Sequence, residues 1–214
     1  MATVLSLPEQ RVILRNISWE TYERLLAENA DCRNPRLAYD RGILEITSPS
    51  AKHEELSYVI TLLVNIVTEE LEIDVRGFGS TTFRRQDLAR GFEPDSCFYI
   101  QGVEDISGKS SLDLATDPPP DLVIEIDLTS ASLDKFPIYA QVGVPEIWRY
   151  DGTALQIFSL EHGTYVEQQV STVLPILTRN VLSRFMRDSK SLKRTVWLRN
   201  LRHWVHIHQE ADGP

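Results

Sequence analysis

Pro118-Pro-Pro-Asp-Leu-Val-Ile-Glu-Ile-Asp-Leu-Thr-Ser130 is the stretch that decides the fold we expect for this chain. Its aliphatic residues recur at every second position from Leu122 to Ile126, which is the period of a β-strand with one face in a core. The other face carries three carboxylates, Asp121, Glu125 and Asp127. Because like charges along one strand repel, a divalent cation is the simplest group that would offset them. The alternative is that this face lies in water and the carboxylates are only solvated.

The composition predicts an ordinary globular protein. The chain has 214 residues, of which 42% are hydrophobic and 25% charged, and this length suits one compact domain with a sizeable core. No apolar run approaches the ~20 residues of a membrane helix, and residues 1–14 do not have the layout of a secretory signal. Two cysteines, Cys32 and Cys97, do not make a disulfide framework or a metal-binding quartet. We therefore expect a cytoplasmic protein with reduced thiols.

The charge is unevenly distributed along the chain. Residues 179–208 hold eight Lys or Arg against Asp188 alone, so this segment carries +7 and the remainder must carry −16 to give the total of −9. The segment is either an arm that binds phosphate or a surface that docks on the acidic body of a neighbouring subunit. Its apolar content favours docking, and hence a homodimer. The apolar residues are Trp197, Leu198, Leu201, Trp204, Val205 and Ile207. We divide the chain into a domain at 1–190 and a basic, aromatic extension at 191–214.

A short helix, a hairpin, a long helix and two strands are expected before residue 101. Residues 18–30 predict a short amphipathic helix capped by Ser18, and residues 36–47 predict a hairpin that turns at Gly42. Apolar residues at spacings of three and four predict a long helix at 52–71. Two strands follow: one at 73–83, in which Gly77 or Gly79 allows a kink, and one at 93–100 that begins with Pro-Asp and places Asp95 at its mouth.

The segment after the acidic strand predicts a parallel crossover. A helix at 135–142, ended by Gly143, connects the acidic strand to another strand at 146–151. A strand–helix–strand unit of this length implies parallel pairing with a right-handed connection. A hairpin at 154–170 and a helix at 177–189 complete the chain. The fold class is therefore α/β (α+β), with a central mixed sheet flanked by helices.

This order of elements resembles the core of the PD-(D/E)xK nuclease superfamily and, more narrowly, the Uma2 family of restriction-endonuclease-like proteins. The resemblance runs from about Ser18 to Phe185 and does not cover the tail beyond Lys190. The matching residues are Ser48-Pro49-Ser50, His53, Pro94-Asp95, Pro120-Asp121-Leu-Val-Ile-Glu125, Lys135, Tyr139 and Gly143-Val144-Pro145-Glu146-Ile147-Trp148. The implied fold is a restriction-endonuclease-like core, and the implied activity is Mg²⁺-dependent hydrolysis of DNA phosphodiester bonds, with Mn²⁺ as a substitute metal.

The resemblance also implies a set of site residues. Asp95 and Glu125 would hold the metal through oxygen ligands, with waters completing the octahedron. The superfamily's strand usually ends acid–x–lysine, but here Glu125-Ile126 is followed by Asp127, so the lysine must come from elsewhere. Lys135 stands where the Uma2 family carries its lysine, and we expect it to share a pocket with both carboxylates. The alternative makes Lys135 a surface residue that neutralises a nearby acid.

Two further acids and one histidine complete the candidates. Asp127 could add a second carboxylate or hold Lys135 in place, and Glu54 could act as an auxiliary acid, although it falls opposite the apolar stripe of its helix. His53, near the start of that helix, is more typical of a capping or packing residue than of a catalytic one. Because the acid–x–lysine signature is altered, the fold could instead serve as a binding or regulatory module without cleavage. A structural, dimer-forming protein is the third possibility.

Overall fold

Two β-sheets form the framework of the protein. The computed structural model describes residues 9–30, 32, 34–128 and 133–209. The first sheet has five strands in the order β1-β3-β2-β6-β5, and every neighbouring pair is antiparallel. Its strands are β1 (Gln10–Arg15), β2 (Arg36–Asp40), β3 (Ile43–Ser48), β5 (Phe83–Arg85) and β6 (Arg90–Phe92).

The second sheet contains the acidic strand. It has six strands in the order β11-β10-β9-β8-β7-β4, and β8 and β9 pair in parallel. Its strands are β4 (Arg76–Gly77), β7 (Ser96–Tyr99), β8 (Leu122–Ile126), β9 (Glu146–Tyr150), β10 (Leu155–Glu161) and β11 (Thr164–Gln168). The mixed sheet, the parallel pair and the hairpin of β10 and β11 are all as the sequence predicts.

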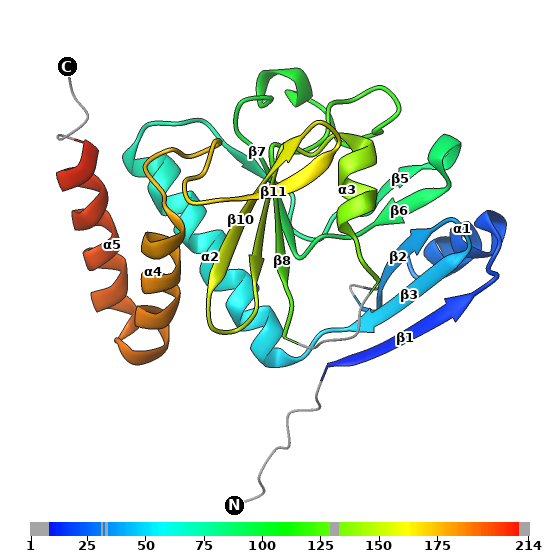
Figure 1. Cartoon of the computed structure of the whole chain (residues 1–214), viewed down its shortest axis with the longest axis horizontal. Helices are drawn as coiled ribbons and strands as arrows, with labels where there is room; N and C mark the ends of the chain where they lie inside the picture. Colours follow the sequence, from blue (N-terminus) through cyan, green and yellow to red (C-terminus); the bar gives the residue numbers. More distant parts are fainter. Residues whose placement is uncertain (1–8, 31, 33, 129–132, 210–214) are drawn as a thin grey trace, which may run out of the picture.

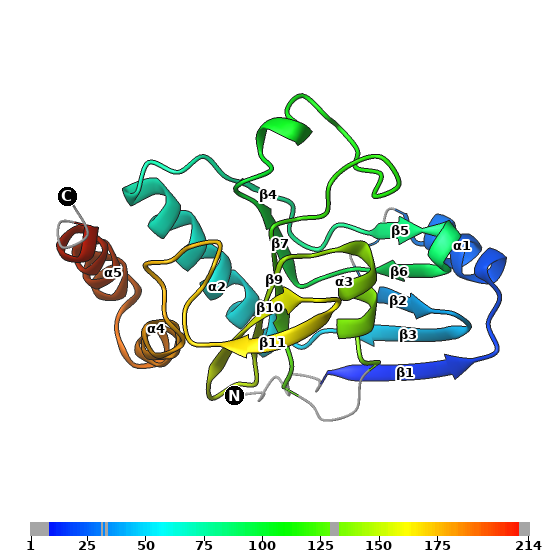
Figure 2. The same cartoon turned by 45° about the horizontal axis from the view of Figure 1, so that its top comes forward.

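Helices cover both faces of the second sheet (Figures 1 and 2). The helices are α1 (Trp19–Glu28), α2 (Ala51–Glu70), α3 (Phe136–Val142), α4 (Arg179–Ser191) and α5 (Arg194–Gln209), with 3-10 turns η1 (Gln86–Leu88) and η2 (Glu104–Ile106). Ser18 and Ser50 cap α1 and α2 through their side chains, and Gly143 ends α3 with a φ of +83°. Within the described residues, no helix is both long and apolar enough for a membrane span.

The alternation along β8 separates its two faces. Leu122, Ile124 and Ile126 are buried in a core formed with α2, α4 and α5. Val123 lies in a second core cluster with α3 on the opposite face. Glu125 alternates with the first set, so it faces α3, and it lines a cavity together with residues of β2 and β3 from the first sheet.

The C-terminal helix α5 belongs to the main core. Trp197, Leu201, Trp204 and Val205 are buried in the same cluster as α2 and α4. Arg202 on this helix forms ion pairs with Glu69 and Glu70 of α2. The apolar residues that led us to expect docking on another subunit are thus largely buried within the chain itself, and they no longer favour that explanation.

One expectation about the strands is wrong, and one strand was not expected. The strand predicted at 73–83 is split into β4 and β5, which belong to different sheets. Gly77 and Gly79 interrupt it: a Cβ on Gly77 would lie 3.1 Å from the ring of Phe98, and Gly79 has a φ of +57°. Strand β6 was not predicted, because three residues are too few to show a period. Its Gly91 leaves room for the Tyr22 hydroxyl, which occupies the place of a side chain.

Candidate active site

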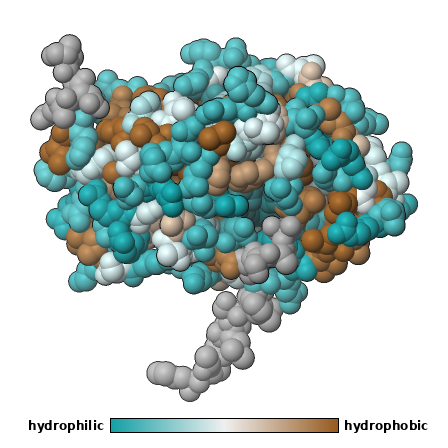
Figure 3. Space-filling model, viewed as in Figure 1, coloured by the Kyte–Doolittle hydropathy of each residue, from teal (hydrophilic) through white to brown (hydrophobic). Residues whose placement is uncertain are grey.

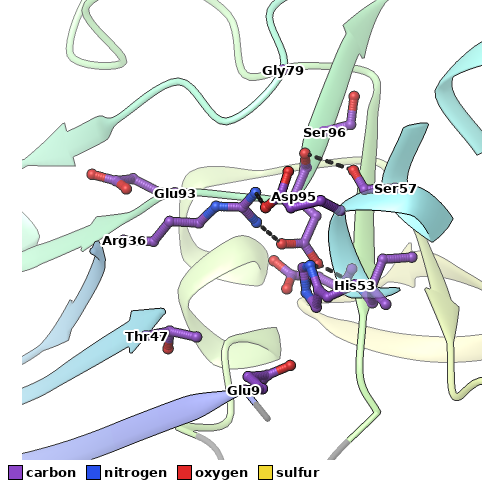
Figure 4. Close-up of polar contacts among 12 residues, drawn as sticks. Glu9, Arg36, Thr47, His53, Ser57, Gly79, Glu93, Asp95 and Ser96 are labelled. Atoms are coloured by element: carbon purple, nitrogen blue, oxygen red, sulfur yellow. Dashed lines mark hydrogen bonds and ion pairs between the residues drawn. The ribbon is translucent and has the colours of Figure 1, made fainter. Parts of the chain in front are cut away.

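A small polar cavity lies where the two sheets meet, beside the start of α2 (Figure 4). Its volume is about 20 Å³, and about 10–15 Å³ suffices for one water molecule. Strands of both sheets, α2 and the residue before α3 all contribute to its wall. The charged and ionisable residues that line it are Arg11, Arg36, Glu45, His53, Glu93, Asp95, Glu125 and Lys135.

Asp95 is the most extensively hydrogen-bonded carboxylate of this cavity. Its side chain is 5% exposed, and Arg36 from β2 and His53 from α2 converge on it (Figure 4). Oδ1 accepts a hydrogen bond from Arg36, and Oδ2 accepts one of 2.6 Å from the backbone N–H of Ile126. Burial alone would raise the pKa of Asp95, but His53, Lys135 and Arg36 outweigh burial and lower it. Asp95 is therefore ionised in the folded protein.

His53 is oriented toward Asp95 from the first turn of α2. Its Nε2 lies 3.1 Å from Oδ2 of Asp95, and only 3% of its side chain is exposed. The neighbouring Ser57 donates a hydrogen bond of 3.2 Å to the Asp95 backbone carbonyl, so α2 holds both the side chain and the main chain of that residue. Burial lowers the pKa of His53, but the hydrogen bond and charge of Asp95 reverse this effect and leave the pKa raised.

Arg36 connects Asp95 to the exposed end of α2. Its Nη2 lies 2.5 Å from Oε1 of Glu54, while its Nη1 donates to Asp95. The Glu54 side chain is 50% exposed, as its position opposite the apolar stripe predicts. Glu54 therefore approaches the site through Arg36 and does not line the cavity itself.

Glu125 is the second proposed metal ligand of the site, and its side chain is 12% exposed. Lys135 donates a hydrogen bond of 2.9 Å to its Oε2, and the Tyr139 hydroxyl donates to its Oε1. Burial and the negative charge of Asp95 raise the pKa of Glu125, whereas Lys135 lowers it. The net effect is a raised pKa. Burial lowers the pKa of Lys135, but Glu125 and Asp95 outweigh burial and raise it, so Lys135 is held as a cation.

Glu45 fixes the segment that carries Lys135. Its side chain is 2% exposed, and its Oε2 accepts a hydrogen bond of 2.7 Å from the backbone N–H of Leu133. A strand of the first sheet thereby anchors the chain two residues before Lys135. Glu45 alternates with the apolar Leu44 and Ile46, which is the sequence signal for its direction.

The structure brings together three of the residues expected to form the site. Asp95, Glu125 and Lys135 all line the cavity, and they come from the start of β7, from β8 and from the residue before α3. Asp127 lines a second cavity beyond Glu125, and its Oδ1 is buried without a hydrogen-bond partner in the described part of the chain. Asp121 lies at the far end of β8, where its Oδ2 accepts hydrogen bonds from three backbone N–H groups. Asp121 thus holds the turn after β7 and lies outside the site.

Sequence reasoning missed Arg36 and assigned His53 a capping or packing role. Nothing in the local pattern distinguishes Arg36 from any other charged residue at the start of a strand. His53 offered one signal, because it precedes the apolar stripe of α2 by three residues and lies on its border. Tyr139 was noted for its family match, and its contact with Glu125 gives that match a physical basis.

The donor set is compatible with a magnesium ion. In the described ranges, no three His, Cys, Asp or Glu side chains cluster as a complete ligand set for a metal. Two carboxylates plus water are sufficient for Mg²⁺, which keeps several of its waters. Each carboxylate oxygen has two acceptor positions, and the contacts of Asp95 and Glu125 leave some of these positions open. Asp95 and Glu125 therefore could hold a hydrated divalent cation.

The His53–Asp95 contact predicts a specific dependence of stability on pH. The folded pKa of His53 is raised, so its charge stabilises the fold fully below about pH 6.5, the unfolded value, and this contribution is lost as pH rises through the folded pKa. In a His53→Gln variant we expect this fall in the free energy of unfolding with rising pH to be absent. Urea unfolding between about pH 5.5 and about pH 8.5 measures the free energy of unfolding. The exposed His203 provides a control, because His203→Gln is expected to follow the wild-type profile. Parallel profiles for wild type and His53→Gln would contradict the prediction.

Comparisons with known proteins agree with this fold. The model of the Uma2 family, described as "Putative restriction endonuclease", matches residues 19–186. A crystal structure from Anabaena variabilis ATCC 29413, described as "a putative nuclease belonging to DUF820", superposes with a TM-score of 0.54 at 18% identity, covering 79% of this chain and 99% of that chain. No curated protein matches the sequence. Because the family model spans most of the 214 residues, the chain belongs to the Uma2 family.

Proposed function

We propose that this protein is a metal-dependent DNA endonuclease that hydrolyses phosphodiester bonds at the cavity between its two sheets. One observation carries the proposal: Asp95, Glu125 and Lys135, which come from three separate segments of the chain, line one cavity. Two carboxylates and a lysine are the groups that metal-assisted phosphodiester hydrolysis requires. The description of the Uma2 family and of its structural relative as nucleases supports the same reaction class.

Each residue of the cavity has a role in this proposal. Asp95 and Glu125 would hold Mg²⁺, or Mn²⁺ in its place. When bound, the ion would polarise the phosphate and lower the pKa of a water ligand. Lys135 would stabilise the negative charge that develops on the phosphate, since its raised pKa makes it an electrostatic group rather than a base. His53 and Arg36 would position Asp95.

A second candidate function is a binding or regulatory module that does not cleave. The observation that favours this function is that donors of the protein itself already bind both carboxylates of the site. Lys135 and Tyr139 hold Glu125, while Arg36 and His53 hold Asp95. In this alternative, these contacts are structural and the site binds no metal.

A cleavage assay decides between the two functions. The purified protein would be incubated with plasmid, linear duplex and single-stranded DNA, and with RNA, in Mg²⁺, in Mn²⁺ and in a chelator. Cleavage that requires the metal and is absent in Glu125→Gln supports the nuclease. Binding of nucleic acid without cleavage under every condition supports the binding module, and the preferred substrate identifies the nucleic acid.

Metal binding should also stabilise the fold. At a Mg²⁺ concentration about 100 times Kd, the gain is about 2.7 kcal/mol, which raises Tm by about 5–10 °C for a chain of this size. The rise should shrink as pH falls through the raised pKa of Glu125, because the protonated acid cannot ligate the ion. Calorimetry with and without Mg²⁺ measures this rise in Tm. Glu104 is exposed, so Glu104→Gln is a control that should show the wild-type rise. An equal rise in Glu125→Gln would place any metal elsewhere.

We also propose that the protein forms a homodimer through β1. This strand is at the edge of the first sheet and exposes apolar side chains, with Val12 53% exposed and Ile13 39% exposed. Figure 3 shows apolar residues interspersed with hydrophilic ones on one face of the molecule. An exposed apolar edge strand is a template for pairing with another strand. We expect Val12→Lys to be monomeric by solution mass, and Val166→Lys, on the edge strand β11, to remain dimeric. A monomeric wild type would contradict the proposal.

A further inference from the structure

A second cavity extends from the candidate active site along the sheet. Its volume is about 70 Å³, and it shares Arg11, Glu125, Ile126 and Lys135 with the first cavity. Beyond these residues its wall includes Asp127 and Arg149. The two cavities are therefore neighbours on either side of the Glu125–Lys135 pair.

Arg149 lies directly beside Glu125 in the sheet. The two residues are partners in the parallel register of β8 and β9. Neighbouring strands are about 4.8 Å apart, and side chains at the same register position lie on the same face. The guanidinium thus lies on the α3 face of the sheet, one strand away from the proposed metal ligand.

Aromatic rings and one amide hold this guanidinium in position. Its central carbon lies 5.4 Å from the ring centroid of Phe136 and 5.1 Å from that of Phe158. Nε and Nη2 donate hydrogen bonds of 3.3 and 2.9 Å to Oε1 of Gln156 on β10. These contacts orient the planar group but do not neutralise it, because neither an aromatic ring nor an amide carries a net charge.

Among the described residues, Arg149 differs from the other cations of the second cavity because it forms no ion pair, although its charge helps to lower the pKa of the nearby Asp151. Lys135 is paired with Glu125, and Arg11 contacts Glu9 and Glu45. In the part of the chain that the structure describes, Arg149 forms no ion pair, although Asp127 and Asp134 also line the cavity. Its Nη1 has no hydrogen-bond partner among the same residues. An oriented cation with free donors is suited to binding an anion.

We propose that Arg149 binds a phosphate of the nucleic-acid strand adjacent to the phosphate that is cleaved. This inference rests on the proposed nuclease function and adds a second phosphate subsite to it. The scissile phosphate lies at Asp95, Glu125 and Lys135, and the strand continues into the second cavity. There the free edge of the guanidinium donates to the phosphate oxygens, which arginine contacts in a bidentate manner. Arg149 thus holds the strand in register with the reacting centre.

Substitution of Arg149 by glutamine tests the subsite. With duplex DNA as substrate in Mg²⁺, we expect Arg149→Gln to raise KM about tenfold with a smaller change in kcat. The dependence of log KM on log salt should become shallower by about 0.9, the slope of one phosphate contact on duplex DNA. Arg184 provides a matched control, because it also lies over aromatic rings, those of Phe185 and Trp204, but on helix α4, away from both cavities. Arg184→Gln should leave KM and its salt slope unchanged.

The outcomes separate this inference from the proposed function. A wild type that cleaves DNA while Arg149→Gln retains the wild-type KM and salt slope overturns the subsite alone. The same conclusion follows if Arg184→Gln changes both quantities equally, since the effect is then one of net charge. If Arg149→Gln does not fold, Arg149→Lys is measured in its place. Retention of the wild-type salt slope by Arg149→Lys supports a phosphate contact at this position, and loss of that slope overturns the proposed contact. A wild type that neither binds nor cleaves nucleic acid overturns both the subsite and the nuclease.

Discussion

Glu125→Gln is expected to reduce metal-dependent cleavage by about 10³-fold or more, the effect of removing a group that stabilises transition-state charge. The amide is isosteric with the carboxylate and can still accept from Tyr139, but it has no charge to hold a cation. It also leaves the ammonium of Lys135, whose side chain is 19% exposed, without its ion-pair partner. Initial rates on plasmid DNA in Mg²⁺ measure the loss.

The unpaired lysine makes the stability of this variant informative. Removing one member of a buried ion pair costs about 3–5 kcal/mol, whereas replacing both by neutral residues costs much less. The double variant Glu125→Gln/Lys135→Met should therefore recover most of the stability lost by Glu125→Gln and still fail to cleave. This pattern separates a loss of chemistry from a loss of fold.

A matched surface variant completes the experiment. Glu167 on β11 pairs with Arg179 at a partly exposed position, with its side chain 39% exposed. Glu167→Gln should change neither stability nor cleavage appreciably, because surface ion pairs contribute little. Cleavage at the wild-type rate by the double variant would show that the activity comes from another site or another protein.

Removal of α5 is expected to prevent folding. A chain that ends at Ser191 loses four side chains from the main core, with exposures of 2% for Trp197, 0% for Leu201, 7% for Trp204 and 0% for Val205. Truncating one large buried side chain costs about 3–5 kcal/mol, and a domain has about 5–15 kcal/mol in total. The loss of all four therefore exceeds the stability available. Circular dichroism and solution mass should show an unfolded or aggregated product.

A single substitution tests the same prediction quantitatively. Trp197 is buried, and its Nε1 donates a hydrogen bond of 2.8 Å to the Phe185 carbonyl. Trp197→Ala should lower the free energy of unfolding by about 3–5 kcal/mol in a urea titration. Ile207 on the same helix is 48% exposed, so Ile207→Ala should cost less than about 1 kcal/mol. A truncated chain that unfolds cooperatively at the wild-type urea midpoint would show that α5 is dispensable.

Local patterns in the sequence determined most of the secondary structure. The alternation from Leu122 to Ile126 predicts both the strand and the face on which Glu125 lies, because strand side chains alternate strictly. Ser18 and Gly143 identify ends of α1 and α3, since capping depends on a single residue and its neighbours. The resemblance to the Uma2 family, and not a local pattern, predicted that Asp95, Glu125 and Lys135 would share a cavity.

Tertiary structure alone decided which other residues complete the site and where the tail lies. Arg36 contacts Asp95 across 59 positions, and Glu45 accepts from Leu133 across 88. Such contacts depend on how the two sheets meet, and no local period encodes that angle or distance. Arg149 became a candidate only through its parallel register with Glu125. The apolar residues of the tail were evident in the sequence, but apolar residues alone do not specify what they pack against. In the structure they pack against α2 and α4 of the same chain.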